Sequence, residues 1–184
     1  MGTLDQKFLY PNGTLRNKLG IRDKKRLQKV EYLQVAHRND QIMENPIIFI
    51  KSFDDLIKIH KILFGWLYDW AGKVRDYQIS KGNTLFLPSD RISNGIRIVN
   101  QDIIQINQKD KPGSLLYARL LDDTNYVHPF REGNGRSTKA MIQKLARNHG
   151  QTIKYPRNTA EMIKVLNRSD IDKISKLMTI DDFK

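Results

Sequence analysis

The sequence predicts an all-α protein that carries one small β-hairpin. Apolar residues recur at spacings of three and four over most of the chain, and Gly or Pro separates many of these segments. Only one stretch changes to short β-prone runs. The length of 184 residues suits a single domain. We therefore expect one domain over 1–184, with a core at about 47–150, a helical extension over 1–46 and short helices within 151–184.

The expected helices follow one another along the chain. A mixed helical pattern covers 24–43 and meets no helix breaker before Pro46. A stronger apolar stripe covers 53–71 and ends at Gly72, a residue that suits a helix C-terminus. The other expected helices cover 91–106, 114–127, 136–149, 159–166 and 171–178.

The segment between the second and third of these helices has a different composition. In VRDYQISKGNTLFLP, residues 74–88, short β-prone runs lie on both sides of KGN, which predicts a hairpin. Because this hairpin lies between long helices, we expect a flap on a helical body and not a sheet in the core.

Composition excludes several classes of function. The chain contains no cysteine, which rules out disulfides, thiolate mechanisms and Cys-ligated zinc. The start does not resemble a signal peptide and no segment reaches a membrane-spanning length, so a cytoplasmic location without membrane contact is expected. The net charge of +12 would suit nucleic acid, an acidic protein or nucleotide phosphates, and does not choose among them.

The stretch HPFREGNGRSTK, residues 128–139, carries the strongest functional signal. Pro129 disfavours helical angles at His128, so the preceding helix should end there with the imidazole at its terminus. Phe130 is expected to anchor the following residues by burial. The stretch therefore predicts a histidine held at a fixed break in the chain.

The second half of this stretch has the properties of an anion site. Gly133, Asn134 and Gly135 allow positive φ and close approach of the backbone to a ligand. A helix that begins near Arg136 would add the free N–H groups of its first turn. Arg136 and Lys139 are three residues apart, which places both cations on one helix face beside this site. Phosphate is the anion that fits best.

Two side chains of the stretch would supply the chemistry. Glu132 offers a hard oxygen ligand for Mg²⁺ held mainly by nucleotide phosphates. The ordinary pKa of histidine is about 6.5, so His128 could accept a proton from a hydroxyl that attacks phosphorus. The residues therefore predict phosphoryl or nucleotidyl transfer, without deciding which phosphorus is attacked. The remaining histidines fall within helical patterns and are expected to be structural or exposed: His37, His60 and His149.

These residues resemble the signature of Fic-domain proteins, HPFx[DE]GNGRxxR, from His128 to Arg136. Residues 63–86 are similar to the helix end and flap that precede this signature, and residues 14–32 to the N-terminal region of small stand-alone bacterial members. The resemblance implies the Fic fold, an all-α domain. It also implies transfer of AMP from ATP to a Tyr, Thr or Ser hydroxyl of a target protein, with release of pyrophosphate.

Carried over position by position, the resemblance implies a role for each motif residue. His128 would deprotonate the target hydroxyl, and Glu132 would bind Mg²⁺ that bridges the α- and β-phosphates. The run 133–135 would cradle the phosphates, and Arg136 would stabilise them. The flap would hold the target segment extended by strand-like pairing, through Lys81, Gly82, Asn83, Thr84 and Leu85.

Two motif positions bear on which group is transferred. Gly135 favours adenylylation, because the related Doc kinases typically carry a larger residue there. Lys139 stands where the family has a second arginine on the γ-phosphate, and lysine offers a point charge instead of a planar, two-pronged donor. Another nucleotide donor, or transfer of phosphate, is therefore an alternative. A basic nucleic-acid-binding module without catalysis is an alternative from a different class.

The glutamates bear on regulation. Many family members are inhibited by a helix with the motif [ST]xxxE[GN], whose glutamate pairs with the second arginine. None of the four glutamates of this chain, Glu31, Glu44, Glu132 and Glu161, stands in an intact motif. We therefore expect a separate antitoxin that supplies this helix, and a bacterial toxin as the free protein. Similar small members are associated with the B-type subunits of DNA gyrase and topoisomerase IV, but no residue here selects that target; nucleic acid is not expected as a direct ligand.

Overall fold

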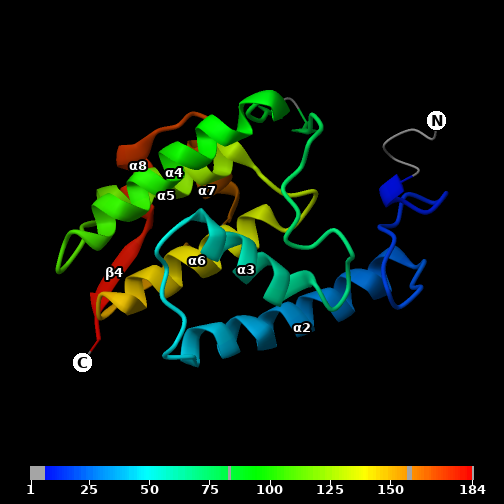
Figure 1. The fold of residues 1–184 in the computed structure, drawn as a ribbon, viewed down its shortest axis with the longest axis horizontal. Coiled ribbons are helices and arrows are strands. Elements are labelled where there is room, and N and C mark those ends of the chain that lie inside the picture. The colour runs from blue at the N-terminus through cyan, green and yellow to red at the C-terminus, as the bar shows by residue number, and fades with distance from the viewer. Residues whose placement is uncertain (1–6, 83, 157–158, 184) are drawn as a thin grey trace.

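The computed structural model describes residues 7–82, 84–156 and 159–183, and the predicted all-α class is confirmed. Figure 1 shows α2 (Lys24–Glu44) along one side of the molecule, with α3 (Phe53–Phe64) beside it and α6 (Asn134–Asn148) passing behind α3. Helix α6 packs against α2, α3 and α5 (Ser114–Val127), so it lies in the centre of the helical body.

Helix α3 begins as its sequence predicts and ends earlier. The Ser52 side chain accepts a hydrogen bond from the N–H of Asp54, and the Asp55 carboxylate accepts one from the N–H of Ser52, which forms a capping box. The helix ends at Phe64 and not at residue 71, and turns follow. Leu67 and its neighbours are nevertheless buried. The apolar spacing therefore predicted correctly which residues are buried, and predicted a helix that is too long.

The two central helices determine where the motif lies. Helix α5 packs against α6, against α4 (Ile92–Asn107) and against α8 (Ile171–Leu177), and a single turn of 3-10 helix, η1 (Ser89–Arg91), precedes α4. Residues 128–133 connect α5 directly to α6. Because both helices are buried on several sides, this short connection is fixed at both ends.

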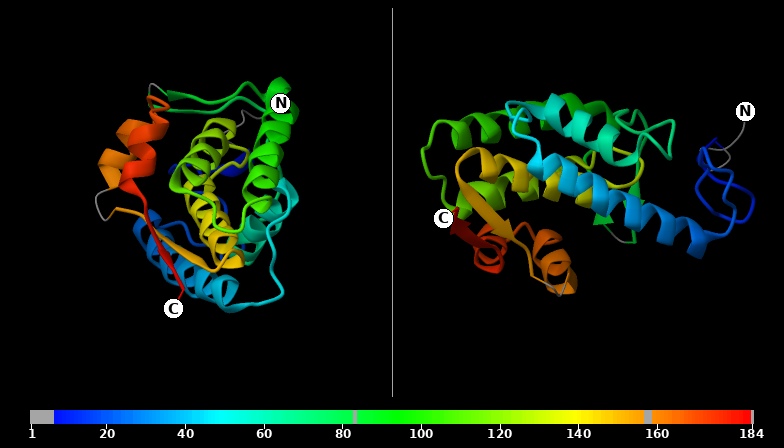
Figure 2. Two further views of the ribbon diagram at one scale, coloured as in Figure 1. Left: turned by 90° about the vertical axis from the view of Figure 1, so that its left-hand side faces the viewer. Right: turned by 90° about the horizontal axis from the view of Figure 1, so that it is seen from below.

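The predicted flap is present. Strand β1 (Ser80–Lys81) pairs antiparallel with β2 (Thr84–Leu85), with Lys81 opposite Thr84. Figure 2 shows this hairpin extending from the side of α4 across the end of the molecule toward α7 (Thr159–Leu166). Asn83, at its tip, lies outside the described residues.

The C-terminal region contains a small sheet that the sequence did not predict. Strand β3 (Gln151–Lys154) pairs antiparallel with β4 (Thr179–Asp182), on either side of the two expected short helices. An ion pair of 2.7 Å between Lys154 Nζ and Asp181 Oδ2 joins the strands. Four-residue strands are too short to show a clear alternation, and their pairing depends on contacts between distant parts of the chain.

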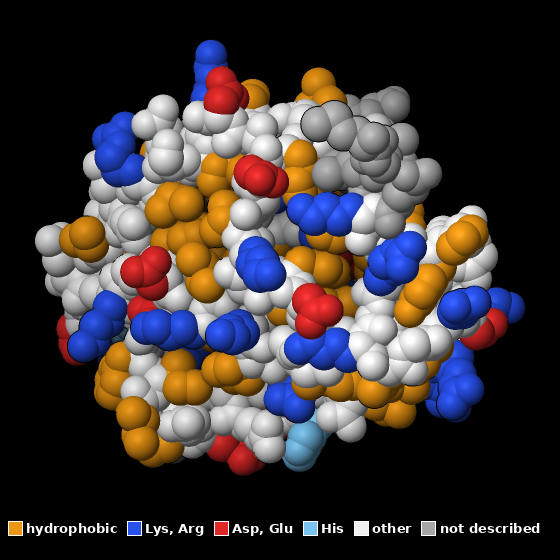
Figure 3. All heavy atoms as spheres, turned by 45° about the vertical axis from the view of Figure 1, so that its right-hand side comes forward, with side chains coloured by type: hydrophobic (Ala, Val, Ile, Leu, Met, Phe, Trp, Pro, Cys, Tyr) orange, Lys and Arg blue, Asp and Glu red, His pale blue; other side chains and the backbone are white. Residues whose placement is uncertain are grey.

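The positive net charge is visible on the surface. Figure 3 shows Lys and Arg side chains spread across one face of the molecule, with fewer acidic side chains among them and hydrophobic side chains between them. This distribution favours anionic ligands in general and does not select one. Among the described residues, no helix combines the length and the apolar character needed to cross a bilayer.

Candidate functional site

A cavity of about 410 Å³ opens where the connection between α5 and α6 meets the flap and α7. Six residues of the 128–139 stretch line it: His128, Glu132, Gly133, Gly135, Arg136 and Lys139. The flap side contributes Thr84 and Phe86, and α7 contributes Met162, Ile163, Leu166 and its neighbour Asn167. The structure therefore brings most of the expected site residues to one hollow, which the flap and a C-terminal helix complete.

His128 is held in a fixed orientation at the end of α5. The helix ends at Val127, and His128 takes the left-handed conformation, φ 44° and ψ 61°, which is unusual for a residue other than glycine. Its Nδ1 lies 3.2 Å from the carbonyl oxygen of Asn125. Because a carbonyl can only accept a hydrogen bond, the neutral ring carries its proton on Nδ1 and a lone pair on Nε2. The ring also stacks on Phe86, with centroids 3.6 Å apart.

Arg75 fastens this helix end to the flap. Its side chain is almost completely buried and donates to four backbone carbonyls: His128 at 2.8 Å, Val127 at 3.1 Å, Leu87 at 2.6 Å and Tyr77 at 2.7 Å. Burial lowers the pKa of the Arg75 guanidinium. The carbonyls come from the end of α5 and from both flanks of the flap, so one side chain fixes the two walls of the cavity relative to each other.

His60 lies outside the motif and holds the motif's backbone in place. Its Nδ1 accepts a hydrogen bond from the N–H of Gly72 at 2.9 Å, so its Nε2–H donates to the carbonyl of Glu132 at 2.9 Å. The imidazole stacks on Phe130 with centroids 3.8 Å apart. Burial lowers the pKa of His60 to about 4. The expected structural role is thus observed, and it consists of holding the backbone beside the metal-ligand candidate.

Within the motif, the Asn134 side chain holds the backbone of the preceding loop in place. The Asn134 side chain accepts from the N–H of Phe130 and donates to the carbonyl of Phe130, both at 2.8 Å, and it is buried. Asn134 can therefore contribute its backbone, but not its side chain, to a phosphate cradle. Gly133 has φ +81°, and a Cβ there would lie 2.6 Å from the ring of Phe64, so glycine is required. A Cβ at Gly135 would meet open space, so the fold does not require that glycine.

Helix α6 begins at Asn134, two residues before the expected start near Arg136. Gly133 precedes it and has no side chain to cap the first turn. Gly133 and Gly135 both line the cavity, so the uncapped N–H groups of this turn lie at its edge. This end of the helix has the partial positive charge that suits phosphate.

Arg136 is held by a residue from the N-terminal extension. Its Nη1 pairs with the Glu31 carboxylate of α2, its Nη2 lies 3.9 Å from Glu132 Oε1, and its guanidinium lies over the ring of Phe64 at 4.7 Å. The Tyr68 hydroxyl donates to the same Glu31 carboxylate. Burial and this hydrogen bond raise the pKa of Tyr68. Glu31 therefore positions a motif cation from a distant part of the chain.

The ion pair between Glu31 and Arg136 was not predicted, although one pattern in the sequence indicates that Glu31 has a partner. Leu27, Glu31 and Val35 are spaced by four residues, and all three are buried on α2. A carboxylate within an apolar stripe needs a cationic or hydrogen-bonding partner, since burial of an unpaired charge is costly. Arg75 has no comparable pattern, because its partners are backbone carbonyls. Tyr68 has none because its partner, Glu31, lies far away in the sequence.

Glu132 fits a metal ion that arrives with phosphates. Its carboxylate lines the cavity, is 53% exposed, and accepts a hydrogen bond from the N–H of Gly133 at 2.9 Å. Within the ranges that the structure describes, no group of three or more His, Cys, Asp or Glu side chains could hold a metal. Mg²⁺ commonly uses one or two carboxylates, water and substrate phosphates. The donor set thus suits Mg²⁺ bound together with a nucleotide.

Lys139 and the flap complete the cavity. Lys139 Nζ lies over the ring of Tyr155 at 4.9 Å, and burial lowers the pKa of Lys139. On the flap, Thr84 lines the cavity, whereas the Leu85 side chain is 73% exposed and Gly82 is also exposed. The side chain of Lys81 lies outside what the structure describes, as does Asn83.

The cavity brings together a fixed imidazole, a carboxylate, an uncapped helix start and two cations, a set of groups that suits the transfer of a phosphate-containing group. The Fic/DOC family model matches residues 51–146, just over half of the chain. The chain belongs to the Fic/DOC family, so the predicted family is confirmed.

Three known proteins show how far this relationship extends. The chain is 33% identical over 149 residues to the protein adenylyltransferase VbhT of Bartonella schoenbuchensis, a match that covers 79% of this chain and 31% of VbhT. It is 27% identical over 170 residues to the probable protein adenylyltransferase Fic of Salmonella typhimurium, covering 88% of this chain and 82% of that protein. The structure of BepC from Bartonella tribocorum with bound AMPPNP covers 98% of this chain and all of that chain, with a TM-score of 0.79 and 21% identity.

The buried histidine predicts a specific pH dependence of stability. In the unfolded chain His60 titrates near 6.5, but in the folded protein it stays neutral down to about pH 4. The stabilisation of the folded state by neutral His60 is therefore complete above pH 6.5. It is lost as the pH falls toward 4, which lowers the free energy of unfolding by about 3 kcal/mol in total. His60→Gln keeps one donor and one acceptor and cannot be protonated, so this part of the acid sensitivity should disappear. Urea unfolding of both proteins between pH 4 and 7.5 measures it.

The control for this experiment is His37→Gln, since His37 is exposed on α2. Its free energy of unfolding should follow the wild-type pH dependence. Equal pH dependence of wild type and His60→Gln would show that His60 is not held neutral in the folded state.

Proposed function

We propose that this protein is a protein adenylyltransferase that transfers AMP from ATP to a hydroxyl group of a target protein. The observation that supports this activity most is the arrangement of His128, Glu132, Arg136 and Lys139 around one cavity at the uncapped start of α6. The relatives named protein adenylyltransferase in Bartonella and Salmonella share most of this chain's length with it.

In the proposed reaction His128 acts as the general base. Its Nε2 takes the proton of the target hydroxyl, whose oxygen forms a bond to the α-phosphorus of ATP. The bond from that phosphorus to the oxygen of the β-phosphate breaks, and pyrophosphate leaves. The hydrogen bond from Nδ1 to the Asn125 carbonyl keeps the lone pair on Nε2 and steadies the imidazolium that forms.

The phosphates would lie between the start of α6 and the two cations. The N–H groups that follow Gly133 and the guanidinium of Arg136 offer donors for the phosphate oxygens, and Lys139 adds charge at the far end. Glu132 would hold Mg²⁺, whose charge offsets that of the phosphates. Gly135 leaves space at the cavity wall, which suits an α-phosphate close to the backbone.

The base of the nucleotide would lie against α7. Met162, Ile163 and Leu166 form an apolar side of the cavity opposite the motif cations, and Asn167 adds a polar group. An aromatic base gains from burial against apolar side chains, and an amide can hydrogen-bond its edge. No sequence pattern indicated a role for these residues.

The flap would receive the target polypeptide. Its strands have two residues each, and within the described ranges they pair only with each other, so a free edge can accept one more strand. Lys81, Gly82, Asn83, Thr84 and Leu85 belong to this proposed contact, and the exposed Leu85 side chain offers an apolar anchor. The modified residue would be a Tyr, Thr or Ser of a target such as a B-type subunit of DNA gyrase or topoisomerase IV.

Regulation by a separate antitoxin, in the bacterial cytoplasm, is part of the proposal. Glu31 pairs with Arg136, the first motif cation, and not with Lys139, where the family's inhibitory glutamate would be expected. The side chain that would inhibit the enzyme is thus expected from a second protein, and the chain without it is expected to act as a toxin.

Labelled ATP tests the reaction. Incubation in a bacterial lysate should transfer label to protein from α-labelled ATP and not from γ-labelled ATP. His128→Ala removes the base and should lower the transfer by at least about 100-fold, while the exposed His37→Ala serves as the matched control and should keep wild-type activity. Mass spectrometry of the labelled band identifies target and residue. Label that enters protein only from the γ-position would instead establish a kinase.

Lys139 tests the choice of nucleotide donor, the alternative that this residue favours. Lys139→Arg restores a planar donor and should tighten ATP binding about three- to tenfold, whereas Lys139→Gln should weaken it by about tenfold. Titration calorimetry on the His128→Ala background measures binding without turnover. If ATP binding is unchanged in both variants while another phosphorylated donor binds better to wild type, the second donor is the substrate.

Expression in bacteria tests the proposed toxicity. The wild-type chain, produced without a partner, should arrest growth, and His128→Ala should grow normally at the same protein level. Harmless expression of a wild-type chain that measurably transfers AMP would contradict the toxin role and leave the enzymatic proposal intact.

A further inference from the structure

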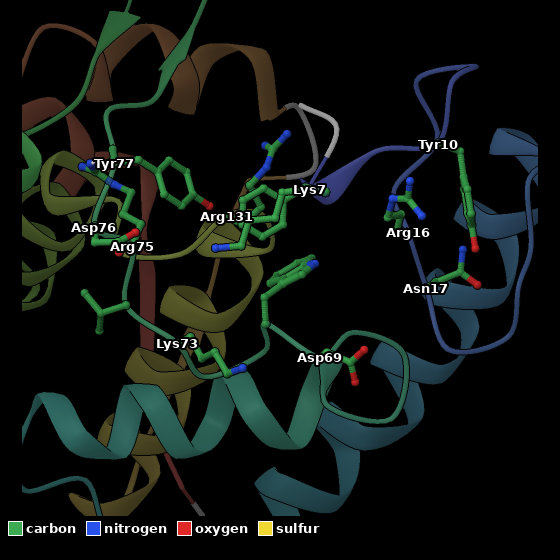
Figure 4. A pocket seen from close by; sticks show the side chains of 13 residues that line it. Lys7, Tyr10, Arg16, Asn17, Asp69, Lys73, Arg75, Asp76, Tyr77 and Arg131 are labelled. Atoms are coloured by element: carbon green, nitrogen blue, oxygen red, sulfur yellow. Dashed lines mark hydrogen bonds between the residues drawn. The ribbon is translucent and has the colours of Figure 1, made fainter. Parts of the chain in front are cut away.

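A second cavity, of about 530 Å³, shares no lining residue with the cavity at His128, the proposed catalytic cavity. It is formed by the segments 7–17 and 69–77 together with Arg131, and is named here the Arg131 pocket. Figure 4 shows the side chains of Lys7, Tyr77 and Arg131 close together in this pocket, with Lys73 below them. Tyr10, Arg16 and Asn17 extend the pocket along the N-terminal segment.

The lining of the Arg131 pocket is strongly basic. Five lining residues are Lys or Arg, and two, Asp69 and Asp76, are acidic. Asp69 lies 3.5 Å from Lys18, outside the lining, so its charge is partly offset elsewhere. The guanidinium of Arg75 is buried in the wall and donates to carbonyls, which leaves its full positive charge there. The pocket therefore attracts anions.

Two donors in this pocket are buried without an acceptor. Arg131 Nε and Trp70 Nε1 are inaccessible to solvent and make no hydrogen bond within the described part of the chain. Buried polar groups are nearly always hydrogen-bonded, because leaving one unpaired costs the free energy of its desolvation. Both residues line the Arg131 pocket, so unpaired donors lie in its wall and add to its positive character.

The aromatic rings of the pocket argue against a nucleobase as this ligand. The Phe8 ring has the ammonium of Lys7 at 5.2 Å, the guanidinium of Arg131 at 5.5 Å and the ring of Tyr77 at 5.4 Å. The Tyr10 ring has two guanidinium groups against it, those of Arg16 at 5.3 Å and Arg22 at 5.4 Å. Rings already in contact with cations are poorly placed to stack on bases, whereas the cations still attract carboxylates.

The pocket also lies beside the path expected for a target polypeptide. Arg131 is the chain neighbour of Glu132, which lines the catalytic cavity. Tyr77 is three residues before Ser80, the first residue of the flap, so their Cα atoms are at most about 11 Å apart. A polypeptide that lies along the flap with a hydroxyl at His128 could therefore place flanking residues in the Arg131 pocket.

We propose that the Arg131 pocket binds an acidic segment of the target protein, which flanks the hydroxyl that is modified. The carboxylates of this segment contact the cationic side chains of Lys7, Lys73 and Arg131. This inference rests on the proposed transfer of AMP to a protein. It adds to that function a second recognition site, selective for Asp and Glu, outside the catalytic cavity.

Peptide binding tests this site without turnover. The probe is a fluorescein-labelled decapeptide of alternating glutamate and serine, and its fluorescence anisotropy is measured with the full chain at 50 and 200 mM salt. The test variant combines Lys7→Gln, Lys73→Gln and Arg131→Gln. The matched control removes three exposed lysines far from this lining, by Lys58→Gln, Lys109→Gln and Lys176→Gln. Circular dichroism and thermal unfolding of both variants confirm that they fold.

We expect the test variant to bind the acidic peptide at least about tenfold more weakly than wild type, and the control variant to change Kd by less than about threefold. A peptide with glutamine in place of glutamate should not bind. Equal weakening of peptide binding in both triple variants would overturn the proposal, because binding would then depend on the net charge of the protein and not on this pocket. Tighter binding of a single-stranded oligonucleotide, lost in the test variant, would assign the pocket to nucleic acid instead.

The same proteins separate failure of this site from failure of the proposed function. With α-labelled ATP and the lysate target, the test variant should raise KM for the target while KM for ATP stays unchanged. If the acidic peptide binds as expected but wild type transfers no AMP, the proposed function fails and the binding site stands. If AMP transfer has the same target KM in the test variant and wild type, the pocket does not recognise the target.

Discussion

The buried guanidinium of Arg75 is the interaction on which the geometry of the site most depends. Its donors join the last carbonyl of α5, the carbonyl of the general-base candidate His128 and the two flanks of the flap. An arginine suits this position because its planar fork offers five donors and keeps its charge. The flap and His128 are therefore fixed relative to one another by one side chain that lies outside the motif.

A second long-range contact brings the N-terminal extension into the site. Glu31 on α2 receives both the Arg136 guanidinium and the Tyr68 hydroxyl, so a motif cation is oriented by a residue 105 positions earlier. The same extension forms one wall of the Arg131 pocket through residues 7–17. The N-terminal residues thus position Arg136 and line the Arg131 pocket, although they precede the region of the family match.

Sequence patterns predicted which helices and strands are present better than the residues at which they begin and end. The flap hairpin and all seven predicted helices are present in the described part of the chain, because apolar spacing and Gly or Pro breaks are local properties. The same spacing extended α3 too far, since Leu67 and Tyr68 are buried by turns and not by a helix. The β3–β4 pair was missed because each strand is short and its partner is supplied by the packing of α7 and α8 between them.

The sequence by itself determined the inventory of the site: a histidine before proline, glycines at the start of a helix, one carboxylate and two cations within twelve residues. These are local choices of residue type and backbone freedom, and they remain recognisable without a fold. Only the tertiary structure decided that Asn134 braces the loop, that Glu31 and His60 hold Arg136 and Glu132, and that α7 closes the cavity. Apart from the Asn134 contact with Phe130, these contacts join residues far apart in sequence, and the packing of α2 and α3 against α6 brings Glu31 and His60 to the motif.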